Sequence, residues 1–200
     1  ADALVPIGGA QVVAALAYGA GPIPAVDVIV GPGNRWVTAA KQLVTGRVGI
    51  DMLAGPSELV VLADDTADAE RVALDLMIEA EHGPDSTTYL VTPSLSLANA
   101  VADRIVDLVG RLGDQRRAYV TTVLGQNGGL LVSRDLDDAI AFTNEFAAEH
   151  LQIASSTPWD LAARIVNAGE ILLGQDAPFS MANFMIGVNA VLPTGGKARS

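Results

Sequence analysis

The sequence predicts an α/β fold, because short apolar segments of strand length alternate with longer amphipathic segments along its 200 residues. Half of the residues are hydrophobic but only 4% are aromatic, so the apolar mass is mainly Ala, Val, Leu and Ile. These side chains suit helices that cover both faces of a mainly parallel sheet. We therefore expect a layered α/β architecture.

The first quarter of the chain contains a short apolar run, an Ala-rich helix that ends at Gly19, and a second helix that Asn34 can cap. The glycines at 31 and 33 stop the strand before that helix. The expected elements are strands at 4–7 and 26–30, helices at 10–18 and 34–44, and an extended segment at 50–53.

The remainder repeats the same alternation over longer segments. We expect strands at 59–63, 87–92, 130–133, 150–154 and 171–173, and helices at 68–81, 95–112, 117–124, 135–148 and 158–167. From 175 onward the chain is rich in loop residues. The pattern suggests two α/β parts that divide near Gly55.

Charge and composition exclude several classes of partner. The net charge is -11, which argues against nucleic acid or an anionic membrane surface, because both require clustered Lys and Arg. No cysteine is present, so thiolate chemistry is excluded. No apolar run reaches the length of a membrane span, and no signal-like N-terminus is present. We expect a cytoplasmic protein that does not bind membranes.

Three glycine-containing turns are candidate ligand sites. Gly8 and Gly9 precede the helix that carries Gln11, and a phosphate or nicotinamide could approach the backbone there. An ordinary tight turn is the favoured explanation of these glycines taken alone, since the G-x-G-x-x-G signature is absent. Asn34 can bind a ligand or cap its helix, and Ser57 can bind a ligand or its own turn backbone.

Each of the two histidines directly follows a glutamate at the end of an expected helix: His82 follows Glu81, and His150 follows Glu149. One turn before His82 lies a second glutamate, Glu79. Glu79 and His82 share one helical face, where they could bind a divalent metal such as zinc. The alternative is an interaction of His82 with the helix dipole. Glu149 and His150 form the other pair, which could act as a general acid and base, or be a solvated junction.

The loop-rich end carries two further polar candidates. Asn183 and Asn189 lie in the segment after the last expected strand. Loops at the carboxyl ends of strands are where α/β folds usually place ligands.

Nine motifs, spread over nearly the whole chain, occur in a specific order. They lie at 8–11, 14–19, 26–34, 37–41, 50–58, 80–86, 149–151, 172–174 and 191–194. In this order they resemble the histidinol dehydrogenase family. The resemblance implies incomplete Rossmann-like domains in a homodimer. It also implies a four-electron oxidation of histidinol to histidine through an aldehyde, with two NAD.

The same resemblance assigns roles to matching positions. Gln11 and Asn34 would contact NAD, and Ser57 would contact the substrate. Glu149 and His150 would be the acid and base, with His150 also touching the substrate.

The implied metal is zinc, with Glu79, His82 and Asn183 at ligand positions, and Asn183 also beside the substrate. Three positions depart from the family pattern. Glu79 replaces a glutamine, Asn183 replaces an aspartate, and Ala190 replaces a histidine. A neutral amide is a poorer zinc ligand than a carboxylate.

The family fold extends beyond both ends of this sequence. The resemblance implies that residues 1–55 belong to a first, NAD-contacting domain and 56–200 to a second domain with the metal and catalytic residues. Regions before residue 1 and after Ser200 would complete the site, and the latter would reach into a partner subunit. The chain therefore predicts an NAD-dependent dehydrogenase for histidinol or a related small polar alcohol. The alternative is a non-catalytic member or fragment that binds a ligand without turnover.

Overall fold

The structure is a computed structural model that describes residues 2–53, 55–181 and 192–199. The chain forms two compact units, Ala1–Gly55 and Pro56–Ser200. Each unit is described by itself. Among the described residues, no helix is long and apolar enough to cross a membrane.

The first unit is a small α/β layer. Its elements are α1 (Gly9–Tyr18), β1 (Val28–Ile29), α2 (Arg35–Val44) and β2 (Gly49–Ile50), and the two short strands pair in parallel. Val13 and Ala17 of α1 pack with Ile29, Val44 and Val48 to form its core.

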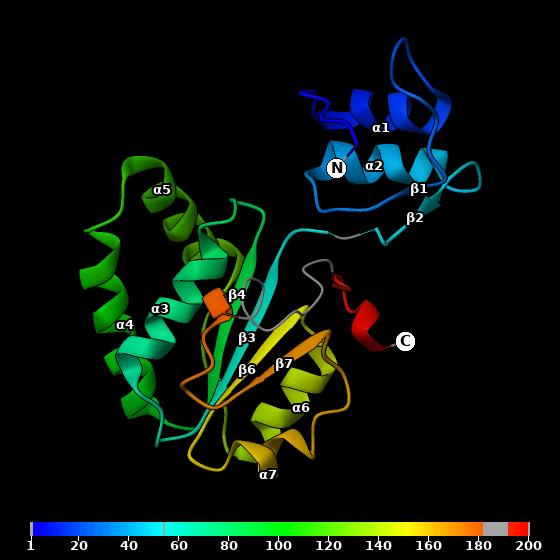
Figure 1. The fold of residues 1–200 in the computed structure, drawn as a ribbon. Helices are drawn as coiled ribbons and strands as arrows, with labels where there is room; N and C mark the ends of the chain where they lie inside the picture. The colour runs from blue at the N-terminus through cyan, green and yellow to red at the C-terminus, as the bar shows by residue number, and fades with distance from the viewer. Residues whose placement is uncertain (1, 54, 182–191, 200) are drawn as a thin grey trace. The chain divides into compact units, whose positions relative to one another are not determined.

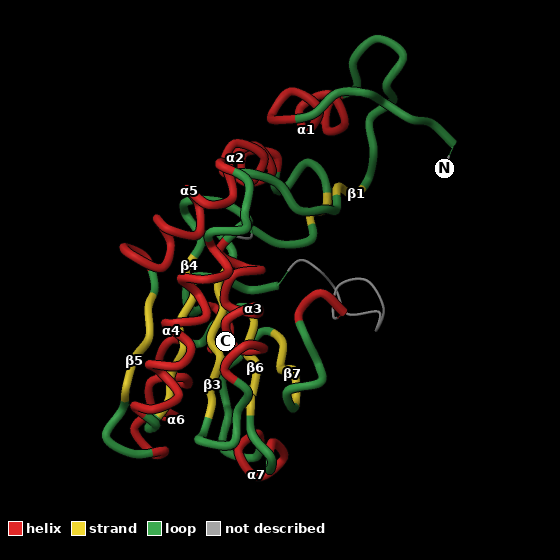
Figure 2. Tube along the Cα trace, turned by 90° about the vertical axis from the view of Figure 1, so that its left-hand side faces the viewer, coloured by secondary structure: helices red, strands yellow, loops and turns green. Residues whose placement is uncertain are grey.

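The second unit is built on a five-stranded sheet in which every pairing is parallel. The strand order is β5-β4-β3-β6-β7, so the chain runs to one edge, crosses back, and continues in the other direction from β3 (Figure 1 and Figure 2). This is the doubly wound arrangement of Rossmann-like folds. The elements are β3 (Glu58–Ala63), α3 (Ala69–Ala80), β4 (Thr87–Thr92), α4 (Leu95–Val109), α5 (Asp114–Thr122), β5 (Gly129–Val132), α6 (Leu136–Phe146), β6 (His150–Ala154), α7 (Pro158–Ala162) and β7 (Glu170–Leu173).

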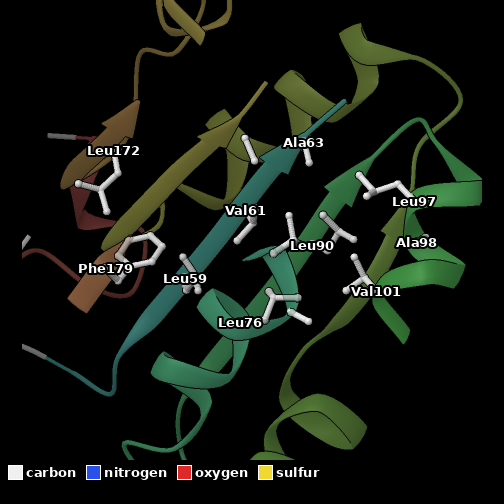
Figure 3. Packing of buried hydrophobic residues seen from close by; sticks show 13 residues of the cluster. Leu59, Val61, Ala63, Leu76, Leu90, Leu97, Ala98, Val101, Leu172 and Phe179 are labelled. Carbon is white, nitrogen blue, oxygen red and sulfur yellow. The ribbon is translucent and has the colours of Figure 1, made fainter. Parts of the chain in front are cut away.

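Helices cover both faces of this sheet, as predicted from the composition. Leu59 and Val61 of β3 point toward α3 and α4, where they meet Leu76 and Val101 (Figure 3). Val60 lies on the opposite face, in a cluster built with α6 and α7. Helix α6 packs on β3 and β4, and α7 packs on β6 and β7. A parallel sheet buried on both faces explains the continuous apolar run of β3.

Several local predictions were wrong. Residues 4–7 form no strand, and the Leu4 side chain is 93% exposed, because this run has no neighbouring strand to pair with in the described chain. The helix expected at 117–124 begins at Asp114 and passes into a π-helical segment, Val123–Asn127. The helix expected at 158–167 ends at Ala162, since 165–168 have no regular structure.

Candidate active site

The candidate catalytic residues gather at the amino-terminal edge of the sheet. His150 and Glu170 are the first residues of β6 and β7, and Glu58 is the first residue of β3. Helix α3 connects two parallel strands and therefore runs back toward this edge. Glu79 is in the last turn of α3, so it lies near the same edge. The edge is opposite to the one where doubly wound folds usually bind ligands.

Glu149 occupies the turn into β6, and it is only 6% exposed. Its Oε2 accepts a hydrogen bond from the backbone N–H of Glu58 at 3.2 Å. Burial raises the pKa of the Glu149 carboxyl to about 8, and the charges of Glu79 and Glu58 add to this rise. The carboxyl therefore holds its proton at neutral pH. A pKa in this range suits a group that gives or takes a proton near working pH.

A glycine allows the chain to pass closely behind Glu149. A Cβ atom added to Gly169 would lie 2.6 Å from the backbone oxygen of Glu149 and 3.1 Å from Pro193 Cδ. The backbone N–H of Glu170 donates to the same Glu149 oxygen at 2.9 Å. Only a residue without a side chain lets β7 begin here.

His150 is buried and has two glutamate neighbours. Its Nδ1 lies 2.7 Å from Glu170 Oε2, and its Nε2 lies 3.8 Å from Glu149 Oε1. The Phe179 ring packs edge-on against the imidazole, with centroids 5.6 Å apart. Glu170 was missed by sequence reasoning, because only the pairing of β6 with β7 brings it beside His150.

A second buried polar group lies on the same face of the sheet. Asp75 of α3 is 3% exposed and is hydrogen-bonded to the Gln152 side chain. Burial raises the pKa of Asp75 to about 6, and the nearby Glu79 charge contributes. Neither Asp75 nor Gln152 was a predicted site residue, and both extend the polar cluster inward from the edge.

Glu79 and His82 are brought together as their helical spacing predicted. His82 Nδ1 lies 3.5 Å from Glu79 Oε2 and 2.9 Å from the Ile78 backbone oxygen. A proton on Nδ1 that bonds to Ile78 leaves Nε2 as the nitrogen that can bind a metal. The described residues contain no group of three or more His, Asp or Glu side chains arranged to hold a metal. Asn183, the third predicted ligand, lies outside the described residues, as do Asn189 and Ala190.

In the first unit, Asn34 is a helix cap. Its Oδ1 accepts hydrogen bonds from the N–H groups of Trp36 and Val37, at 3.0 and 3.2 Å. Its amide nitrogen can still act as a donor. Gln11 is exposed in the first turn of α1, whose cap residue Gly8 offers no side-chain hydrogen bond.

A buried ion pair fixes the turn before Asn34. Lys41 is 3% exposed and pairs with Asp51, and its Nζ also donates to the Gly31 oxygen at 2.8 Å. Asp51 Oδ2 accepts from the Gly31 N–H at 2.8 Å. Although burial acts to raise the pKa of Asp51, the bonds from Lys41, Gly31 and Met52 outweigh it, so this pKa is lowered.

Ser57 stands directly before β3, next to the Glu58–Glu149 contact. Its backbone oxygen accepts from the Thr87 N–H at 2.9 Å, so its main chain belongs to the sheet edge. Ser57 is half-buried. Ser57 therefore lies at the same amino-terminal edge as the other candidate residues of the second unit.

The turn after β3, at the carboxyl-terminal edge of the second unit, does not suit a pyrophosphate. The turn after β3 carries Asp64, Asp65 and Asp68 and has no glycine. Ser155 fills the start of the loop after β6, where its Oγ donates to Asp64 Oδ2 at 2.5 Å. Negative side chains at the start of α3 would repel a phosphate group that a helix N-terminus otherwise attracts.

Comparisons with known proteins match the whole length of the chain. The family model for histidinol dehydrogenase matches residues 1–200. The chain is 46% identical to the histidinol dehydrogenase of Thermus thermophilus over 199 residues, which are 100% of this chain and 48% of that protein. It is also 46% identical to the enzyme of Haloarcula marismortui over 200 residues, again 100% of this chain and 47% of that protein.

Solved structures agree with the sequence relatives. The crystal structure of histidinol dehydrogenase from Elizabethkingia anophelis matches with a TM-score of 0.89 and 38% identity, over 96% of this chain and 44% of that chain. A propionaldehyde dehydrogenase from Clostridium phytofermentans, with a TM-score of 0.54 and 16% identity over 94% of this chain and 54% of that chain, shares the fold alone. The chain spans about half the length of the curated relatives it matches. This chain belongs to the histidinol dehydrogenase family.

Proposed function

We propose that the native protein containing this chain is an NAD-dependent dehydrogenase that oxidises histidinol through histidinal to histidine, or oxidises a related small polar alcohol. One observation carries the proposal beyond family membership. Glu149 and His150 are buried side by side, one with its pKa raised to about 8 and the other paired with a second carboxylate. An alcohol oxidation needs a base for the hydroxyl proton, and this pair supplies one.

The side chains of this pair divide the proton transfers. His150 Nε2 is the nitrogen left available by the Nδ1–Glu170 contact, so it takes the proton from the substrate hydroxyl. Glu149 lies 3.8 Å from that nitrogen, too far for a direct hydrogen bond but close enough for a water or hydroxyl to bridge them. The first oxidation releases one hydride and one proton. The second consumes one water and releases one hydride and two protons, because its product is a carboxylate.

NAD, when bound, supplies the acceptor for each hydride. Gln11 and Asn34 are the residues proposed to contact it. Both lie at the start of a helix, where backbone N–H groups favour an anionic ligand. The acidic turn after β3 in the second unit supports this choice, because it leaves the glycine turns of the first unit as the better place for phosphate groups.

Zinc, when bound, supplies Lewis-acid polarisation of the substrate hydroxyl. The Glu79 carboxylate and His82 Nε2 fit such an ion in chemistry, and the Nδ1 contact with Ile78 already orients the ring. Glu79 is 2% exposed and lies near Glu149 and Asp75, and a cation would offset this concentration of carboxyl groups. Asn183 is the proposed third ligand.

The substrate is either histidinol or a related small polar alcohol. Ala190 and Asn183 stand where the family pattern has histidine and aspartate, and these changes alter the groups that recognise an imidazole-bearing substrate. We also propose a homodimer, because the family site draws residues from a partner subunit. Light scattering of the full native gene product tests the assembly.

NADH formation by the full native gene product tests the proposed activity. The substrates are histidinol and a panel of amino and sulfo alcohols, with metal content measured on the same sample. We expect turnover of at least one alcohol and stoichiometric zinc. The absence of turnover in a folded, NAD-binding protein would instead favour the non-catalytic alternative, which the substitutions at Glu79, Asn183 and Ala190 motivate.

His150→Ala separates chemistry from binding. We expect it to lower kcat on the order of 10²- to 10⁴-fold, the usual contribution of a general base, with little change in NAD affinity. Equal losses of turnover and of NAD affinity would show that His150 is structural.

A further inference from the structure

The pairing of β6 with β7 sets a buried carboxylate against the imidazole. His150 lies directly opposite Glu170 in the parallel register. Opposite residues on neighbouring strands point to the same face, so both side chains point toward α3. A slip of one residue would move Glu170 to the other face and break the contact.

The contact is short and shielded from water. Nδ1 of His150 lies 2.7 Å from Oε2 of Glu170, and each side chain is 5% exposed. The Glu149 carboxyl, at 3.8 Å, is the other acidic group near the ring among the described residues. Glu170 is therefore the hydrogen-bond partner of the imidazole, in a setting where such bonds are strengthened by the low dielectric.

We propose that Glu170 is a positioning residue for the dehydrogenase reaction. It holds the proton of neutral His150 on Nδ1 and so leaves the Nε2 lone pair to accept the substrate proton. This inference rests on the proposed function of His150 as the base. A buried carboxylate that fixes the tautomer of a catalytic histidine is an established device in enzymes.

A further contact keeps the ring in one orientation. The Phe179 ring meets the imidazole edge-on at an interplanar angle of 73°. Phe179 is 1% exposed and belongs to the same cluster as Leu59, the β3 neighbour of His150 (Figure 3). A ring flip would require this cluster to open, so the carboxylate and the aromatic ring together fix which nitrogen faces Glu149.

A contribution to stability does not explain why a glutamate occupies position 170. Its second oxygen, Oε1, is buried and has no hydrogen-bond partner among the described residues. A carboxylate buried with one satisfied oxygen costs free energy that an apolar residue would not. A role in orienting His150 accounts for a carboxylate at this position.

Nitrogen NMR of the full native gene product, labelled with ¹⁵N-histidine, tests the proposal. The His150 signals are assigned by their loss in His150→Gln, and spectra are recorded at a pH where the ring is neutral. We expect a protonated Nδ1 and a bare Nε2 in the wild type. In Glu170→Ala we expect the proton to move to Nε2 in a substantial fraction of molecules. Glu70→Ala, an exposed glutamate of α3, is the matched control and should leave the signals unchanged.

Kinetics on the same samples distinguish a role of Glu170 in orienting His150 from a merely structural role. We expect Glu170→Ala to lower kcat on the order of 10²-fold while KM changes little, since the effect falls on proton transfer. In Glu170→Gln the amide can turn its oxygen or its NH₂ toward Nδ1, and kcat should follow whichever tautomer the spectrum shows.

Three results would overturn the proposal. They are a wild-type His150 with its proton on Nε2, a variant that has the altered tautomer but an unchanged kcat, and a Glu170→Ala protein with an unaltered tautomer. A wild type with the expected tautomer but no turnover of any alcohol would instead count against the proposed function, because the spectra do not depend on activity.

Discussion

Replacing Glu149 with glutamine measures how strongly burial keeps this carboxyl neutral. Glutamine has the shape of the protonated side chain and can still accept the hydrogen bond from the Glu58 N–H. It carries no charge at any pH. The variant therefore removes the pH-dependent cost of ionising the buried group. The changed hydrogen bonding adds a difference in the free energy of unfolding that does not depend on pH.

The size of that cost follows from the pKa. Burial raises the pKa of Glu149 from 4.5 to about 8. At about 1.4 kcal/mol per pH unit, this makes the charged form roughly 5 kcal/mol less favourable in the folded protein than in the unfolded chain. Because the folded pKa is the higher one, the folded state binds more protons between these values, and wild-type stability falls as the pH rises through them.

Equilibrium urea unfolding of the metal-free native gene product is the assay. The stability of Glu149→Gln relative to wild type should increase by about 3 kcal/mol between about pH 5.5 and about pH 8.5. Glu145→Gln, on the exposed surface of α6, should show no such increase. A relative stability of Glu149→Gln that is flat across this range would refute the claim that burial controls Glu149. A chelator is present throughout, because a cation at Glu79 would reduce the repulsion.

Three further substitutions test the scaffold by urea or thermal unfolding. Lys41→Met leaves the partly exposed Asp51 without its cation and should cost about 1–2 kcal/mol; the double variant with Asp51→Asn should recover part of this loss, and no recovery would contradict the pairing. Asp68→Ala removes the side-chain cap of α3 and should cost about 1 kcal/mol, with an unchanged stability arguing against the cap. Phe179→Ala empties a fully buried position and should cost about 3–5 kcal/mol; a loss below about 1 kcal/mol would mean that the ring is not packed as described.

Hydrophobic patterning was enough to predict the layers of this fold. The apolar run of β3 and the amphipathic pattern of α3 led to the right element types. Element ends were less accurate, because capping and packing decide them. The run at 4–7 resembles a strand in composition, but a strand requires a partner, and this segment has none in the described chain.

The candidate site was only partly predictable, because contacts between residues far apart in the sequence depend on tertiary packing. Helical spacing alone placed Glu79 beside His82, since residues three apart share a helix face. Asn34 shows what the sequence could not decide. A ligand contact and a helix cap were both open from the sequence, and the structure shows the cap. The location of the site was not predictable, as the usual preference of α/β folds is for the carboxyl ends of strands.

The sequence by itself determined the α/β class, the order of the elements and the motifs that mark the family, because these depend on residues close together in the chain. Tertiary structure decided which distant residues meet. Glu170 reaches His150 through the register of two strands, and Glu58 reaches Glu149 across neighbouring strand ends. The raised pKa of Glu149 also belongs to the folded state, since it comes from burial beside other carboxylates that only folding brings together.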